Sequence, residues 1–285
     1  MIQGRFFLVG CPRSGTTLLQ SMLGCSPELA TFKESHFFSR AFPQRLKTFP
    51  AMRNPRRLVQ EFYAENNIEL NADISFSLVE RLSRVSTGRF FIRSLDRAAE
   101  YRDCLSWLEK TPRHLLYIDL IESSETPETA PIQFIHLVRD GVAVASSLYR
   151  ASESWSNPVS PINALLRWQK EINVTRRFVG RPNHHLVIYE DLVDDAERIC
   201  LSLANVCGIY LKPEHLLKRE MVLSNITRDN ETWKMDTAHH QVKHLSRAES
   251  HVGKDVLEVL ESKIDRTDYN WLRRFSCSER PNSTS

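Results

Sequence analysis

Residues 5–24 read RFFLVGCPRSGTTLLQSMLG. An apolar run typical of a buried strand passes into a glycine-containing loop, and a helical pattern follows. In this context the motif G-x-x-x-x-G-K-[ST] binds phosphate through backbone N–H groups at a helix N-terminus. Gly10, Gly15 and Thr17 match the motif, but Thr16 stands in place of the lysine. The stretch therefore predicts an α/β fold with a P-loop-like anion site. Because the lysine is missing, the motif does not identify which anion is bound.

Beyond this stretch, short apolar runs alternate with longer amphipathic segments, which is typical of βαβ units and a parallel sheet. We expect strands at 5–10, 29–34, 105–110, 132–138 and 184–189, and helices at 16–24, 113–122, 141–151, 161–178 and 194–207. The predicted fold is a P-loop-like three-layer α/β sandwich, with a central parallel sheet of about four to five strands. We expect one domain over 1–275, with a helical insertion at 41–104 that caps an acceptor site and a polar tail at 276–285.

The composition narrows the class of protein. The 285 residues are 41% hydrophobic and 26% charged, which is ordinary for a globular chain, and the net charge of +3 lacks the dense basic face of a nucleic-acid-binding protein. No stretch approaches 18 apolar residues, so we predict no membrane span. Six cysteines without a CxxC pair or zinc spacing indicate a reducing compartment and no metal site. We therefore predict a cytoplasmic protein.

A second anion site is indicated by LVRDGVAVASSLYR at 137–150. Arg139 follows a predicted strand and Ser147 lies on the next helix, at the edge of the sheet where α/β proteins bind ligands. A guanidinium suits phosphate oxygens, although a local Arg139–Asp140 ion pair is an alternative. An ATPase would need a Walker-B aspartate for Mg²⁺ at such a strand end. Two anion sites on one sheet favour instead a nucleotide with phosphates at both ends.

At this point the motifs resemble those of sulfotransferases that use PAPS (3′-phosphoadenosine 5′-phosphosulfate). PRSGTTLL (12–19) is similar to their 5′-phosphosulfate loop, and VRDGVAVASSL (138–148) is similar to their 3′-phosphate motif. FKESHFF (32–38) resembles a segment that carries a glutamate base in the glycan and tyrosylprotein branches, and EKTPRHLL (109–116) resembles one with a lysine near the transferred sulfuryl group. VIYEDLV (187–193) resembles a segment with a tyrosine near the nucleotide, and NETWK (230–234) adds a lysine.

The resemblance implies roles for particular residues. The expected nucleotide-binding residues are Arg13, Ser14, Gly15, Thr16, Thr17, Arg139, Ser147, Tyr189 and Lys234. The expected catalytic residues are Glu34 as base, with Arg13 and Lys110 stabilising charge on the leaving phosphate. His36 is a rival base, because on a strand it would share the face of Glu34.

The predicted reaction is in-line transfer of the sulfuryl group from PAPS to a hydroxyl or amine, without a metal and with PAP (3′-phosphoadenosine 5′-phosphate) as product. The acceptor stays open among small molecules, glycans, lipids and peptide tyrosine. Two alternative functions stay open as well: a P-loop kinase of small molecules, and a nucleotide-binding protein without catalytic activity.

Overall fold

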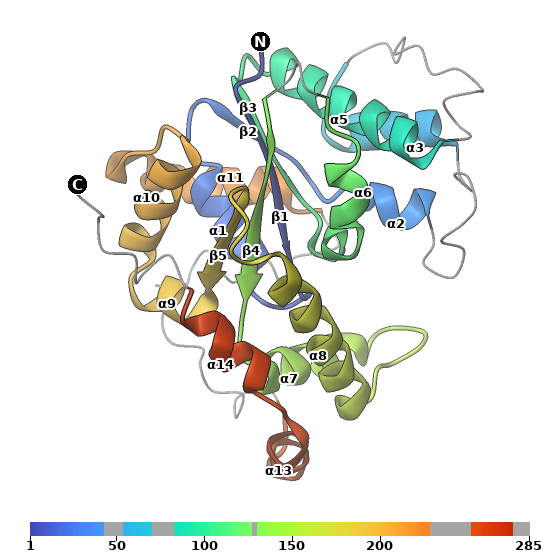
Figure 1. The fold of residues 1–285 in the computed structure, drawn as a ribbon, viewed down its shortest axis with the longest axis vertical. Coiled ribbons are helices and arrows are strands. Elements are labelled where there is room, and N and C mark those ends of the chain that lie inside the picture. Colours follow the sequence, from blue (N-terminus) through green and yellow to red (C-terminus); the bar gives the residue numbers. More distant parts are fainter. Residues whose placement is uncertain (43–53, 70–82, 127–129, 229–251, 276–285) are drawn as a thin grey trace.

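The computed structural model describes residues 1–42, 54–69, 83–126, 130–228 and 252–275. Five parallel strands form one sheet in the order β2-β3-β1-β4-β5. Their bounds are β1 Gly4–Gly10, β2 Leu29–Thr31, β3 Ser106–Lys110, β4 Ile132–Val138 and β5 His184–Ile188. Helices lie on both sides of the sheet (Figure 1), so the predicted three-layer α/β architecture is confirmed.

The position of β1 in the middle of the sheet explains its continuous apolar sequence. Phe6 and Leu8 pack against α1 (Thr16–Leu23) and α10 (Ala196–Cys207) on one side of the sheet. Phe7 and Val9 join the aromatic cluster on the other side, where Phe7 meets Trp107 edge to face with ring centroids 5.3 Å apart. A strand covered on both faces needs apolar residues at every position, which produces the continuous run at 6–9.

The described residues within 41–104 contain helices. These helices include α3 (Pro55–Glu65) and α5 (Arg84–Tyr101), which pack into the main core together with α2 (Phe37–Ala41). Arg5 on β1 forms an ion pair of 2.6 Å with Asp96 on α5, and Trp107 Nε1 donates to the same carboxylate at 2.8 Å. The insertion is therefore built into the domain rather than attached to its surface.

The remaining helices follow the strand ends. A 3₁₀ helix (Pro112–Tyr117) and α6 (Ile118–Glu122) follow β3, where a single helix over 113–122 was predicted. The helices α7 (Gly141–Ser152) and α8 (Pro161–Phe178) follow β4. After β5, a short helix that was not predicted, α9 (Tyr189–Asp194), precedes α10, which corresponds to the helix predicted over 194–207. Asp195 caps α10 by accepting from Arg198 N at 3.2 Å.

The described residues of the C-terminal third contain helices and no strand. A 3₁₀ helix (Pro213–Lys218) and α11 (Arg219–Ile226) lie near α1, and α13 (Lys254–Lys263) and α14 (Thr267–Arg273) pack against α7 and α8. Among the described residues, no helix is both long and apolar enough to cross a membrane.

Candidate active site

The loop after β1 is shaped to receive an anion. It joins Gly10 to Thr16 at the carboxyl end of the central strand. Gly15 begins α1 with a φ of 93°, a left-handed conformation that favours glycine, and a Cβ atom there would overlap the Tyr189 ring. The first N–H groups of a helix have no partner within the helix, and no side chain caps α1 among the described residues. Such N–H groups at the carboxyl end of a central strand are chemically suited to an anion.

The two predicted anion motifs touch one another. Arg13 Nε in the loop donates to Ser147 Oγ on α7 at 3.1 Å, and Arg139 Nη1 donates to the Arg13 carbonyl at 3.3 Å. The Arg139 guanidinium lies over the Tyr189 ring, 4.2 Å from its centroid. The structure thus brings four predicted nucleotide-binding residues from four different elements into one cationic cluster.

The electrostatics of this cluster favour a bound anion. Arg139 is 7% exposed, and burial together with the nearby Arg139 charge lowers the pKa of Arg13 to about 10. Two guanidinium groups held so close in a buried place repel each other, and an anion between them would remove that cost. Ser14 adds a buried hydroxyl that has no hydrogen-bond partner among the described residues.

Asp140, considered above as a local partner for Arg139, has a different role. Its Oδ1 caps α7 by accepting from Val142 N at 2.9 Å and from Ala143 N at 3.2 Å. Its Oδ2 forms an ion pair of 2.8 Å with Arg266. This cap fixes the start of α7, and hence the place of Ser147 two turns later.

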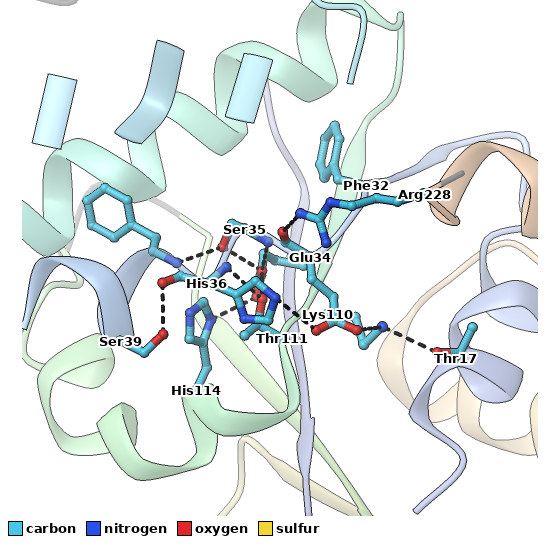
Figure 2. Close-up of polar contacts among 12 residues, drawn as sticks. Thr17, Phe32, Glu34, Ser35, His36, Ser39, Lys110, Thr111, His114 and Arg228 are labelled. Atoms are coloured by element: carbon cyan, nitrogen blue, oxygen red, sulfur yellow. Dashed lines mark hydrogen bonds and ion pairs between the residues drawn. The ribbon is translucent and has the colours of Figure 1, made fainter. Parts of the chain in front are cut away.

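Two of the predicted catalytic residues, Lys110 and Glu34, form a row with Thr17 and His36 beside the loop (Figure 2). Lys110 ends β3 with its side chain 1% exposed, and its Nζ is ion-paired with Glu34 Oε1 and lies 3.3 Å from Thr17 Oγ1. The second carboxylate oxygen of Glu34 lies 3.4 Å from His36 Nε2. The row therefore runs from the first turn of α1 through an ammonium group to a carboxylate and an imidazole.

One expectation for this row is wrong. The strand predicted over 29–34 ends at Thr31, because β2 is an edge strand that pairs with β3 only over Leu29–Thr31. Glu34 and His36 lie in the turn that follows, so they share no strand face. His36 has a φ of 50° at the start of α2. The two side chains meet because this turn folds back.

The environments of Glu34 and His36 differ. The Glu34 side chain is 13% exposed, and Arg228 Nη2 donates to its backbone carbonyl at 2.7 Å. The His36 side chain is 44% exposed, yet burial lowers its pKa below the ordinary 6.5, although the Glu34 charge opposes this. His36 is therefore neutral at pH 7 and chemically able to accept a proton.

Several residues of the site were not predicted. Glu109, Ser35, Thr111 and His114 form a buried polar cluster behind the row, and only the charged residue beside Lys110 in EKTP hinted at it. Tyr189 begins α9 instead of ending a strand. Lys234 lies outside the described residues. In the described ranges, no group of three or more His, Cys, Asp or Glu could hold a metal ion.

Comparisons with known proteins show the family and agree with the fold. A family model described as the Sulfotransferase family matches residues 5–213. The sulfotransferase domain of the Synechococcus PCC 7002 olefin synthase is 22% identical and covers 92% of this chain and 95% of its own, with a TM-score of 0.59. The sulfotransferase domain from the curacin biosynthetic pathway is 19% identical and covers 92% and 97%, with a TM-score of 0.53. Among curated proteins, no sequence relative matches.

Proposed function

Because the chain belongs to the sulfotransferase family, we propose that it transfers the sulfuryl group of PAPS to a hydroxyl or amine of an acceptor. One observation carries this proposal: the two anion motifs meet through Arg13 and Ser147, beside the Lys110–Glu34 pair. A nucleotide with a phosphate at each end suits such a cluster. The loop N–H groups and Arg13 would hold its 5′-phosphosulfate, and Arg139 and Ser147 its 3′-phosphate.

In the reaction, an S–O bond forms to an acceptor hydroxyl, or an S–N bond to an acceptor amine, while the S–O bond to the 5′-phosphate breaks, and the electron pair of that bond leaves with PAP. Lys110 and Arg13 offset the negative charge that grows on the leaving phosphate. Glu34 accepts the acceptor's proton. Lys110 is ion-paired with Glu34, so Lys110 turning toward the phosphosulfate of PAPS would release the carboxylate for this role.

Nucleotide choice tests the proposal first. We expect calorimetry with PAP to show tight binding in the presence of a metal chelator, and ATP to bind far more weakly, because Arg139 and Ser147 have no 3′-phosphate to hold in ATP. Equal binding of the two nucleotides would overturn the proposal. Magnesium-dependent consumption of ATP would favour a small-molecule kinase, and PAP binding without transfer to any acceptor class would favour a non-catalytic protein.

The choice of base needs a pair of variants. Glu34→Gln should keep PAP affinity and reduce transfer by about 10²–10⁴-fold, the usual contribution of a general base. His36→Asn should lose far less, because in this proposal His36 only contacts the carboxylate. The opposite ranking of the two variants would make His36 the base. The assay should offer small-molecule, glycan, lipid and tyrosine-peptide acceptors. We also propose that residues 41–104 cap the acceptor site.

A further inference from the structure

A buried carboxylate lies behind the proposed active site. Glu109 is 1% exposed, and its Oε1 accepts hydrogen bonds from Ser35 Oγ at 2.8 Å and from Thr111 Oγ1 at 2.6 Å. Its Oε2 lies 2.9 Å from His114 Nδ1. Burial alone would raise the pKa of Glu109, but the His114 charge and these hydrogen bonds lower it below its usual value. Glu109 is thus an ionised acceptor inside the protein.

Strand β3 places this carboxylate and the proposed catalytic lysine on opposite faces. Side chains of a strand alternate, so Lys110 points to the face of Glu34 and Thr17, while Glu109 and the extended Thr111 point to the other. Both faces nevertheless contact the same segment, the 34–37 turn (Figure 2). The carboxyl end of β3 therefore holds this turn from two sides.

The two hydroxyl groups connect Glu109 to the backbone of the turn. Thr111 Oγ1 accepts from His36 N at 3.2 Å, and Ser35 Oγ accepts from Phe37 N at 3.2 Å. Each hydroxyl donates to Glu109 and accepts from the turn, so its donor and acceptor capacity are both used. His36 has a φ of 50°, a conformation that non-glycine residues keep only where their surroundings enforce it.

We propose that Glu109 is a positioning residue, which fixes the 34–37 turn through the hydroxyls of Ser35 and Thr111 and so holds Glu34 and His36 in line with Lys110. The inference rests on the proposed sulfuryl transfer at this site. A carboxylate that must meet an acceptor hydroxyl within hydrogen-bond reach loses much of its effect when its backbone shifts by about 1 Å. Glu109 does not touch the reacting atoms, so its effect on catalysis is indirect.

Thr111→Val tests the inference, because it removes the hydroxyl with little change in shape and no change in charge. We expect kcat to fall at least tenfold while the Kd for PAP stays within threefold, since the phosphate contacts lie elsewhere. Thr111→Ser restores the hydroxyl and should recover kcat to within threefold of the native value. Glu109→Gln should resemble Thr111→Val; if it does not fold, Thr111→Val decides alone.

The chain offers a matched control. Glu122 Oε1 lies 3.0 Å from His184 Nε2, so these residues form a second glutamate–histidine pair. His184 is the first residue of β5, and the pair therefore lies at the opposite end of the sheet from the site. Glu122→Gln should keep the native kcat. A fall in kcat equal to that of Thr111→Val would show a general loss of stability and overturn the inference. So would a native kcat in Thr111→Val, or a PAP affinity that weakens in proportion to kcat.

A readout that needs no activity separates this inference from the proposed function. His36 is flanked by Glu34, Glu109, His114 and Arg228, and burial lowers its pKa. Loosening the turn in Thr111→Val should expose the ring and raise the His36 pKa, as measured by NMR titration, whereas Glu122→Gln should leave it unchanged. An unshifted His36 in Thr111→Val overturns the inference. A native protein that never transfers sulfuryl overturns the proposed function instead, and the titration still decides whether the turn is fixed in this way.

Discussion

Replacing Arg139 with methionine should weaken PAP binding about 10- to 100-fold and leave the fold intact. In the structure Arg139 is 7% exposed, donates to the Arg13 carbonyl at 3.3 Å and stacks over Tyr189. Methionine keeps an unbranched apolar stem but removes the guanidinium group and its charge. The substitution therefore isolates what the guanidinium does for an anion.

The expected loss of PAP affinity follows from the strength of a charged hydrogen bond, and the expected change in stability from two opposing effects. A hydrogen bond to a charged group contributes about 1.5–3 kcal/mol, and each 1.4 kcal/mol is about tenfold in Kd. The variant loses the cation–π contact between Arg139 and Tyr189, which lowers the free energy of unfolding by about 0.5–2 kcal/mol. The variant also gains stability, because the repulsion between the Arg139 and Arg13 charges, which helps to lower the Arg13 pKa, is gone. We expect the melting temperature to move by no more than about 4 °C.

Calorimetry with PAP at fixed salt, paired with thermal melts, measures both effects. Arg181→Met is the control, because Arg181 also stacks on an aromatic ring, 4.5 Å from the Phe178 centroid, but just before β5 at the far end of the sheet. Native PAP affinity in Arg139→Met would refute the reasoning. Equal weakening in Arg181→Met would show that the loss is not local to the site.

Two further predictions concern the loop and the response to acid. Gly15→Ala should abolish PAP binding, because its methyl group would overlap Tyr189. Gly180 has a similar φ of 97° but open space around it, so Gly180→Ala should lower the unfolding free energy by about 1–2 kcal/mol and keep PAP binding. Equal PAP affinities of the two variants would contradict this prediction. Burial, helped by the His184 charge, holds the pKa of His136 well below 6.5, so the unfolded chain binds a proton that the folded chain does not. Unfolding free energy should therefore fall as pH drops below about 6.5, by about 2 kcal/mol at pH 5 for this one histidine. Urea titrations of His136→Gln should show a smaller fall between pH 7 and pH 5, and an unchanged fall would count against this account.

Some expectations stay predictions. Calorimetry with PAP in the presence of a metal chelator tests the PAPS donor and metal independence, and the cytoplasmic location stays a prediction. The contact of Lys234 with the nucleotide concerns a residue outside the described ranges. The assignment of Glu34 as base depends on the comparison with His36.

The sequence by itself determined the five strands, the loop between β1 and α1, and most helix positions. These features are local: a strand covered on both faces requires a continuous apolar run, and α7 and α10 each begin at a capping aspartate, Asp140 and Asp195. The strand expected over 29–34 was too long, because the length of an edge strand depends on its single neighbour, which the sequence does not reveal.

Only the tertiary structure decided how the motifs meet. Arg13 reaches Ser147 across 134 positions, and Lys110 reaches Glu34 across 76, because the parallel pairing of β3, β1 and β4 brings their carboxyl ends to one edge. Glu109 looked like any charged residue beside a motif. Its burial and its link to the 34–37 turn exist only once β2 and β3 are side by side, since contacts between distant segments depend on the register of the whole sheet.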